Sequence, residues 1–366
     1  MTMLSIIIPT YREADNILPL VGRIRAALEP AIAYEIVFVD DNSRDGIDAR
    51  VEEVVRAGAP VRLIVRTDER GLSSAVLRGF REARGDVLLC MDADMSHPPE
   101  AIPQMFQTLQ AQQADLVVGS RYVAGGSVEE GWGFYRWLNS QVALWLARPL
   151  SKVRDNGAGF FMLPARVFKL GRDLNPIGYK MLIEISVKCP CQKVVELPIH
   201  FSDRKFGQSK LSTREQLLYL LHLKRLYDYK FGWISRLVQF CAVGLSGLVV
   251  NLAVFALLRQ FSIANGVAYA FAIWASLTWN FIPHRYLSYD PKARQPVLPQ
   301  YLQYVLHCLA GAVVNWMVAI PLALASGRFD GHVYLAALAG IGAGAMVNFV
   351  VWRFLSGTIS DEKRNA

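Results

Sequence analysis

The feature that most constrains this chain is a series of four charge-free apolar stretches after residue 232. They cover Leu237–Leu258, Gln260–Pro283, Leu302–Gly327 and Gly331–Trp352. Each is about long enough to cross a hydrocarbon core of ~30 Å as a helix. Buried helices of a soluble protein are the alternative, but four in succession argue against it. We therefore expect four transmembrane helices over residues 233–356 and a tail at residues 357–366.

These stretches contain an internal repeat. Gly247–Asn251 matches Gly311–Asn315, and Asn280–Ser288 matches Asn348–Ser356. The first two helices therefore look duplicated as the last two, and this part of the chain resembles the small GtrA-like membrane domains. The four asparagines of the repeat are polar groups in or near apolar spans. Interhelical hydrogen bonding is the favoured explanation, and a role in transport is the alternative.

Charge predicts how the helices are oriented. Basic residues flank the stretches on one side: Lys224, Arg225, Lys230, Arg236, Arg285, Lys292, Arg294, Arg353, Lys363 and Arg364. The opposite loops carry little beyond Arg259 and Arg328. The positive-inside rule places both termini of this multi-pass protein in the cytoplasm, and the sequence shows no signal peptide. The net charge of +8 suits anionic lipid better than nucleic acid, because no nucleic-acid reading module is recognisable.

The N-terminal part alternates between apolar runs and helical spacing. The expected strands are 4–9, 35–39, 61–65 and 86–91, and the expected helices are 15–28 and about 72–83. This alternation indicates a mostly parallel α/β sheet. Ligands of such sheets bind at the carboxyl ends of the strands.

Two carboxylates, Asp92 and Asp94, follow the last of these strands directly. In extended backbone, residues i and i+2 point the same way, so both can converge on one cation. Hard oxygen ligands suit Mg²⁺ or Mn²⁺, which usually also hold substrate phosphates. A solvated turn is the alternative explanation of this short pattern. The five cysteines form no recognisable zinc or disulfide pattern.

Several motifs together resemble the family 2 glycosyltransferases, most closely those that use polyprenyl phosphate. They are Pro9–Glu13, Asp40–Gly46, Asp92–Asp94 with His97-Pro98, Gly119–Tyr122, Asp155 with Gly159-Phe160, Gly178–Lys180 with Glu184, Glu196–Ile199 and Phe201–Leu211. The resemblance covers about residues 3–230 and implies a GT-A-type catalytic domain over residues 1–211. Amphipathic helices over 212–232 would join this domain to the membrane.

The resemblance implies roles for individual residues. Asp94 is the expected direct metal ligand, Asp92 supports metal and donor, and Ser96 stands where the family has a Gln or Ser ligand. The expected contacts of the nucleotide sugar are Pro9, Tyr11, Glu13, Asp40, Asp41, Asp92, Ala93, Asp94, Arg121, Arg204 and Lys210. Glu13 or Asp40 could instead cap their loops. Arg121, Arg136, Arg204 and Lys210 are the candidates for the acceptor phosphate, since guanidinium forks suit phosphate oxygens.

The function that this resemblance implies is inverting transfer of mannose from GDP-mannose to a polyprenyl phosphate of the dolichyl type, with Asp94, Asp92 and Arg204 as catalytic residues. Transfer of glucose from UDP-glucose, or of aminoarabinose, is the alternative within the family. A processive polysaccharide synthase lacks support, because no Gln-x-x-Arg-Trp signature is present. A flippase or scaffold for lipid-linked sugar is the non-enzymatic alternative.

Overall fold

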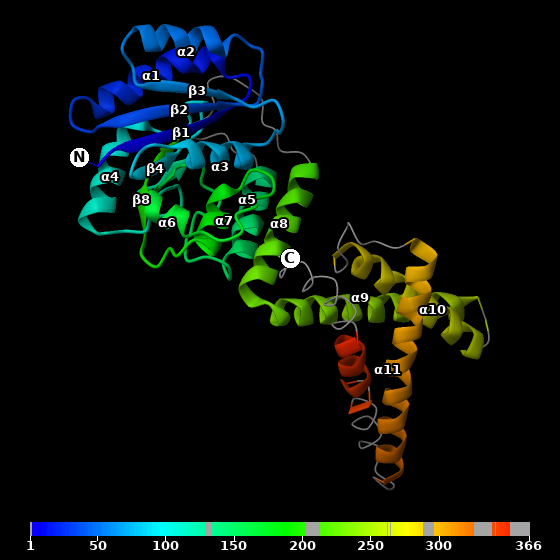
Figure 1. Ribbon diagram of the computed structural model, residues 1–366. Helices are drawn as coiled ribbons and strands as arrows, with labels where there is room; N and C mark the ends of the chain where they lie inside the picture. Colours follow the sequence, from blue (N-terminus) through cyan, green and yellow to red (C-terminus); the bar gives the residue numbers. More distant parts are fainter. Residues whose placement is uncertain are drawn as a thin grey trace, which may run out of the picture. The chain divides into compact units, whose positions relative to one another are not determined.

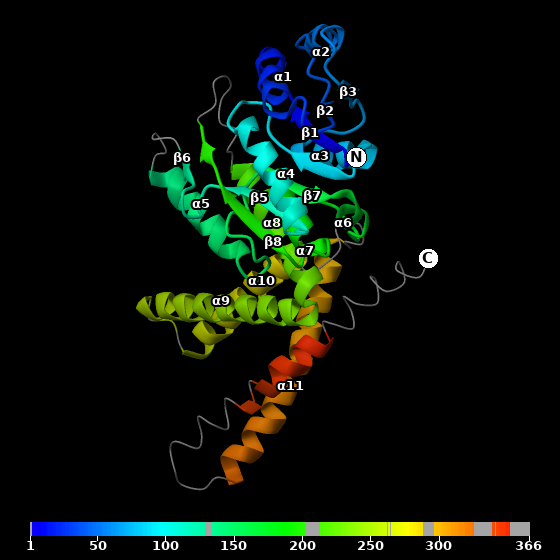
Figure 2. The ribbon, with the colours of Figure 1, turned by 90° about the vertical axis from the view of Figure 1, so that its left-hand side faces the viewer.

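The computed structural model describes residues 2–128, 134–202, 213–261, 263, 265–287, 296–325, 339, 340 and 342–351. The chain forms two compact units, Met1–Phe231 and Gly232–Ala366. Figures 1 and 2 show the first as an α/β unit and the second as a set of helices. The second unit begins at Gly232, and the helix that precedes it belongs to the first unit.

A seven-stranded sheet forms the centre of the first unit. Its strands are β1 (Leu4–Thr10), β2 (Tyr34–Asp40), β3 (Val61–Val65), β4 (Val87–Cys90), β5 (Leu116–Ser120), β7 (Phe161–Pro164) and β8 (Val194–Pro198), in the order β3-β2-β1-β4-β7-β5-β8. All neighbours are parallel except β7, which runs antiparallel to β4 and β5. The expected mostly parallel GT-A sheet is therefore confirmed. Two short strands, β6 (Ser127–Val128) and β9 (His200–Phe201), form a second sheet.

Helices cover both faces of the sheet, so its strands are apolar on both sides. The helices on one face are α1 (Ala14–Leu28), α2 (Ile47–Arg56) and α4 (Ile102–Ala111), which pack on side chains such as Ile6 and Ile8. Those on the other face are α3 (Leu72–Glu82), α6 (Ala165–Lys169) and α7 (Met181–Lys188), which pack on Ile7 and Val39. The short η1 (Pro99–Ala101) precedes α4. Packing against these two layers of helices holds the strands in place, and with them the loops at the strand ends.

Two further helices pack against each other beside α7. They are α5 (Phe134–Ala147) and α8 (Thr213–Phe231), and Leu150, Leu223 and Leu226 are among the side chains buried there. Hydroxyl groups of Tyr219 and Tyr227 each donate a 2.8 Å hydrogen bond to a carbonyl of α5. The amphipathic helices expected over 212–232 are thus a single helix, α8, which is docked on the rest of the first unit.

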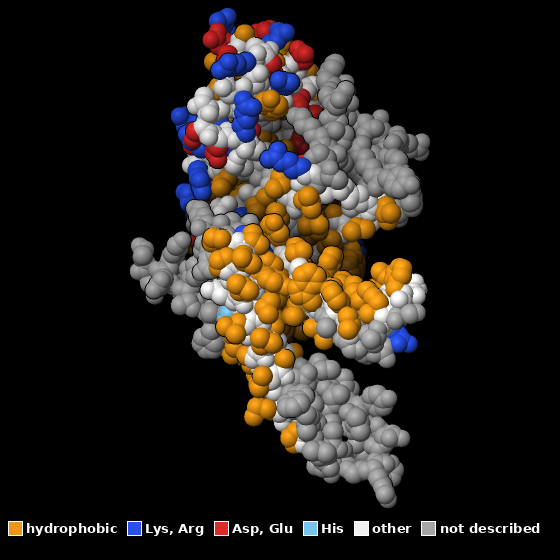
Figure 3. Space-filling model, turned by 90° about the vertical axis from the view of Figure 1, so that its right-hand side faces the viewer, with side chains coloured by type: hydrophobic (Ala, Val, Ile, Leu, Met, Phe, Trp, Pro, Cys, Tyr) orange, Lys and Arg blue, Asp and Glu red, His pale blue; other side chains and the backbone are white. Residues whose placement is uncertain are grey.

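The second unit is helical, with α9 (Trp233–Gln260), α10 (Asn265–Leu287), α11 (Val297–Ala325) and a last helix, Gly342–Val351. Within its described residues, Trp233–Gln260 and Val297–Val314 are long and apolar enough to cross a membrane. On the face drawn in Figure 3, hydrophobic side chains gather on the helices of this unit, whereas charged ones gather on the first unit. The count of four crossings stays a prediction.

The repeat of the second unit creates the same contact twice. A Cβ atom on Gly247 would lie 2.3 Å from Oδ1 of Asn280, and one on Gly311 would lie 2.1 Å from Oδ1 of Asn348. Both oxygens are buried without a hydrogen-bond partner among the described residues. The expected interhelical hydrogen bond is therefore not made by these two oxygens. Instead each amide fills the space that a glycine leaves on the neighbouring helix.

Candidate active site

The carboxyl ends of β1, β2, β4 and β5 lie at one edge of the sheet, and polar loops follow each of them. Register pairs Thr10 with Asp40, the last residues of β1 and β2. Several non-glycine residues of these loops have positive φ angles, namely Arg12, Asn42, Arg44 and Met95. Such conformations are strained and concentrate at functional sites. The edge that the sequence indicates is therefore also where the backbone is strained.

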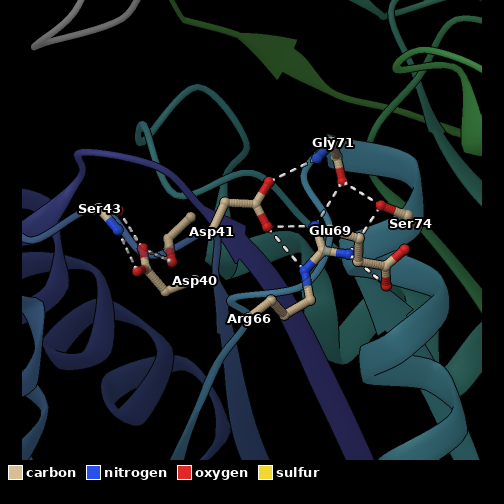
Figure 4. Close-up of polar contacts among 8 residues, drawn as sticks. Asp40, Asp41, Ser43, Arg66, Glu69, Gly71 and Ser74 are labelled. Carbon is tan, nitrogen blue, oxygen red and sulfur yellow. Dashed lines mark hydrogen bonds and ion pairs between the residues drawn. The ribbon is translucent and has the colours of Figure 1, made fainter.

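The end of β2 and the loop after it hold Asp40 and Asp41, which Figure 4 shows. Asp40 accepts hydrogen bonds from the backbone N–H and the hydroxyl of Ser43, and from Thr10 Oγ1 at 3.2 Å. Asp41 pairs with the buried Arg66 and accepts a 2.7 Å hydrogen bond from the backbone N–H of Gly71. Both carboxylates thus hold loops together, and their direct contact with a nucleotide stays a prediction.

The loop after β1 is joined to the loop after β2. The backbone N–H of Arg12 donates to Ser43 Oγ at 2.9 Å, and that of Ala14 donates to Asp45 at 3.0 Å. Glu13 precedes α1 and accepts a 2.6 Å hydrogen bond from Asn16. Glu13 therefore contacts a side chain in the first turn of its own helix, and its contact with a nucleotide stays a prediction. Pro9 lies inside β1, beside Val39.

Tyr11 lies between two cationic side chains of different loops. The guanidinium carbon of Arg12 is 5.3 Å from the centre of the Tyr11 ring, and that of Arg70 is 5.8 Å away. Such distances allow cation–π attraction. The positive charges of Arg12 and Arg70 therefore lie beside Tyr11, at the edge where a nucleotide diphosphate is expected.

The loop after β4 contains the predicted metal ligands. Asp94 is buried and accepts hydrogen bonds from the backbone N–H of Ser96 at 3.1 Å and from its hydroxyl at 2.6 Å. The side chain of Asp92 keeps 27% of its exposure, and Ala93 between them is buried. Among the described residues no three His, Cys, Asp or Glu side chains form a metal-binding cluster. Asp92 and Asp94 are therefore the carboxylates that this loop offers to a cation.

The buried side chain of His97 supports this loop. Its Nδ1 accepts a 3.0 Å hydrogen bond from the backbone N–H of Asp92, and its ring stacks on Phe160 at 5.2 Å. Burial lowers the pKa of His97, against the opposing effect of Asp92 and Asp94. A neutral imidazole that accepts at Nδ1 carries its proton on Nε2. This side chain therefore orients the Asp92 backbone.

The loop after β5 brings a cation to the same edge. Arg121 donates to both oxygens of Asp155, at 2.8 and 2.7 Å, and its backbone N–H donates to the same carboxylate. Burial raises the pKa of Asp155, but the hydrogen bonds and charge of Arg121 outweigh it and hold that pKa below its ordinary value. The bidentate pair fixes the guanidinium plane. Arg121 is thus oriented before any substrate binds.

Glycines allow these groups to approach one another. A Cβ on Gly159 would lie 3.2 Å from both carboxylate oxygens of Asp92, and one on Gly157 would lie 2.6 Å from Lys180 Nζ. The chain before β7 therefore runs between the predicted metal ligand and two cations, Arg121 and Lys180. The sequence indicates Asp155 and Lys180 only as family matches and gives them no role. Their long-range contacts are what place them in the site.

Three predicted residues cannot be placed in this geometry. Arg204 and Lys210 lie outside the described residues, and Arg136 lies in α5 without a described side chain. Their roles stay predictions. Of the predicted site residues, the structure thus brings Asp92, Ala93, Asp94, Ser96 and Arg121 to one edge, together with the ends of β1 and β2 and the loops after them, which hold Pro9, Tyr11, Glu13, Asp40 and Asp41.

Comparison with known proteins identifies the kind of enzyme. Residues 5–170 match the model of glycosyl transferase family 2, and residues 239–356 match the GtrA/DPMS transmembrane domain. A dolichol-phosphate mannosyltransferase of Pyrococcus furiosus is 41% identical over 357 residues, which cover 96% of this chain and 98% of the relative. The chain belongs to the family 2 glycosyltransferases. It is a membrane protein with a GtrA/DPMS transmembrane domain.

Other relatives match a smaller share of this glycosyltransferase. A dolichol-phosphate mannosyltransferase of Saccharomyces cerevisiae is 43% identical over 237 residues, 62% of this chain and 88% of its own. Mannosyl-3-phosphoglycerate synthase from Rubrobacter xylanophilus, a solved structure, is 20% identical with a TM-score of 0.48, and the match covers 64% of this chain and 76% of that one.

Proposed function

We propose that this glycosyltransferase transfers mannose from GDP-mannose to a polyprenyl phosphate of the dolichyl type and inverts the anomeric centre. The proposal rests on one observation. Asp92 and Asp94 lie at the same sheet edge as Arg121, whose guanidinium is oriented by Asp155. Two phosphate-bearing substrates need such a mixture of metal ligands and cations. The names of the relatives support mannose as the sugar and a dolichyl phosphate as the acceptor.

The residues present fit a hard divalent cation, Mg²⁺ or Mn²⁺. Asp92 and Asp94 offer carboxylate oxygens, and Ser96 holds Asp94 in place through two hydrogen bonds. Such ions usually keep positions for substrate phosphates. When bound, the ion supplies Lewis-acid neutralisation of the leaving diphosphate. Arg121 supplies a further fixed positive charge at the same edge.

The acceptor needs little activation by the protein. The second pKa of a phosphomonoester is about 6, so the phosphate is mostly a dianion near neutral pH and can attack the sugar directly. The site must therefore orient two anionic groups and keep their charges compensated. Arg121 is held in one orientation by Asp155, which restricts where a phosphate oxygen can bind.

The apolar side chains of α5 and α8 support a membrane-bound acceptor. Leu138, Val142 and Trp145 are exposed at helical spacing on α5, and Leu217, Leu220 and Leu221 are exposed on α8. We place these surfaces at the lipid interface, with four membrane helices after them and both termini in the cytoplasm.

The test is transfer by the purified full-length protein. Radiolabelled GDP-mannose and UDP-glucose are each incubated with a polyprenyl phosphate and Mg²⁺ or Mn²⁺, and the lipid is extracted. We expect label in lipid from GDP-mannose only, with a β linkage, and loss of transfer after chelation. Labelling from UDP-glucose alone would replace the proposed donor, and no transfer from any donor would support the flippase or scaffold alternative.

A further inference from the structure

Lys180 occupies a position in the site that no expected role explains. It directly precedes α7, two residues after Gly178, which has a φ angle of +74°. Its ammonium donates a 3.3 Å hydrogen bond to the carbonyl of Gly157, in the segment that leads to β7. The same segment carries Asp155 and Gly159. Lys180 therefore reaches the carboxyl edge of the sheet from a helix that is distant in sequence.

The surroundings place this ammonium beside the other charged groups of the site. A Cβ on Gly157 would lie 2.6 Å from Lys180 Nζ and 3.5 Å from Arg121 Nη2. Two residues later, Gly159 lies against the Asp92 carboxylate. Arg121, Lys180 and Asp92 thus approach one short stretch of backbone, where any larger residue would keep them apart.

Arg121 has a carboxylate partner within the protein, whereas the Lys180 ammonium lies 4.8 Å from the centre of the Tyr179 ring. Asp155 directs both carboxylate oxygens to Arg121. In the described part of the chain Lys180 forms no ion pair, and its one hydrogen bond is to a neutral carbonyl. Burial and then the neighbouring Arg121 lower the pKa of Lys180 to about 8, although Asp155 and Asp92 act in the opposite direction. A partly buried ammonium beside a second cation is suited to bind an anionic group.

We propose that Lys180 is a substrate-binding residue whose ammonium contacts a phosphate oxygen during transfer, next to Arg121. The inference rests on the proposed function, because both substrates in that function carry phosphate. The phosphate can belong to the diphosphate of the donor or to the phosphomonoester of the acceptor. The residue remains partly exposed, as a ligand-binding group must be.

The test compares three variants in the full-length protein. Lys180→Met removes the charge, Lys180→Gln keeps an N–H donor for the Gly157 carbonyl without charge, and Lys180→Arg keeps the charge. Hydrogen bonds to charged groups correspond to a loss of about 10- to 100-fold when removed. We expect Lys180→Met and Lys180→Gln to lose about that much in kcat/KM, and Lys180→Arg to retain most of it. Lys169→Met, an exposed lysine at the opposite sheet edge, is the matched control.

Separate binding measurements identify the phosphate that Lys180 contacts. If calorimetry shows that Lys180→Gln weakens binding of GDP with Mg²⁺ by a similar factor, the donor is the source. If GDP binding is unchanged while KM for a short-chain polyprenyl phosphate rises, the acceptor is the source. Either result supports the inference.

Two results would overturn it. One is a kcat/KM of Lys180→Gln within about 3-fold of the wild type, which would show that the hydrogen bond to Gly157 is the whole role. The other is a loss in Lys180→Arg as large as in Lys180→Met. Failure of the proposed function is seen separately, as absence of mannose transfer by the wild type. The kcat/KM values of the same variants can then be measured with whichever nucleotide sugar is active, since each such donor bears a diphosphate.

Discussion

The two units of this protein bury polar groups in opposite ways. In the catalytic unit, two buried carboxylates are paired with arginines, Asp155 with Arg121 and Asp41 with Arg66. In the helical unit, the amides of Asn280 and Asn348 are instead pressed against glycines of a neighbouring helix. Fixed charges can orient substrates, whereas an amide against a glycine specifies how two helices pack. The comparison therefore assigns the chemistry to the first unit and helix packing to the repeat of the second.

The largest expected effect is in the catalytic unit. Asp94→Asn keeps an oxygen that can accept the hydrogen bonds of Ser96 but removes the charge that binds a cation. Transfer should fall by at least about 1,000-fold, since several kcal/mol of transition-state stabilisation are lost, while thermal unfolding changes little. Asp86→Asn, at the other end of β4, should keep full activity. Near-wild-type turnover of Asp94→Asn in saturating Mg²⁺ or Mn²⁺ would refute the assignment.

Asp155→Asn tests whether charge pairing holds the site together. The change leaves Arg121 without its carboxylate partner, and removing one partner of a buried ion pair costs about 3–5 kcal/mol. Chemical denaturation of the catalytic unit should show a loss of that size. If stability is unchanged, the pair is not needed for the fold and the contrast between the units weakens.

In the helical unit the corresponding test is steric. Gly247→Ala should destabilise the protein in detergent by about 1–3 kcal/mol, as overpacking does, because its Cβ would overlap Asn280. The double variant with Asn280→Ala should recover most of that stability. Gly244→Ala is the control on the same helix, since nothing lies within 4 Å of its Cβ. Equal melting temperatures for Gly244→Ala and Gly247→Ala would contradict the packing argument.

The smallest effect is a pH dependence. The lowered pKa of Lys180, about 8, means that its charge is present below that pH and is lost as pH rises through it. Transfer should therefore fall by about 10-fold between pH 7 and 9, while the acceptor phosphate stays ionised. Lys180→Arg should remove this decline, because arginine stays protonated. An identical decline in both proteins would assign it to another group.

The sequence predicts the parts of the site that local pattern determines. Asp92 and Asp94 follow an apolar strand, so their position at the sheet edge follows from the alternation of strands and helices. The antiparallel β7 has no such signal, because its direction depends on pairing with β4 and β5. Lys180 meets Arg121 only through that arrangement. Similarly, the repeat suggests that Asn280 and Asn348 are equivalent, but their glycine partners emerge only from helix packing.

The most direct test of the division between the units is a chain that ends at Gly232. The first unit has its own hydrophobic cores, so the shortened protein should fold and bind GDP. It should transfer mannose to a short, detergent-soluble polyprenyl phosphate at a rate close to that of the full chain. With a long lipid in bilayers it should be much slower, because membrane confinement raises the effective acceptor concentration. A folded, GDP-binding but inactive shortened protein would contradict the account, since the membrane helices would then form part of the acceptor site.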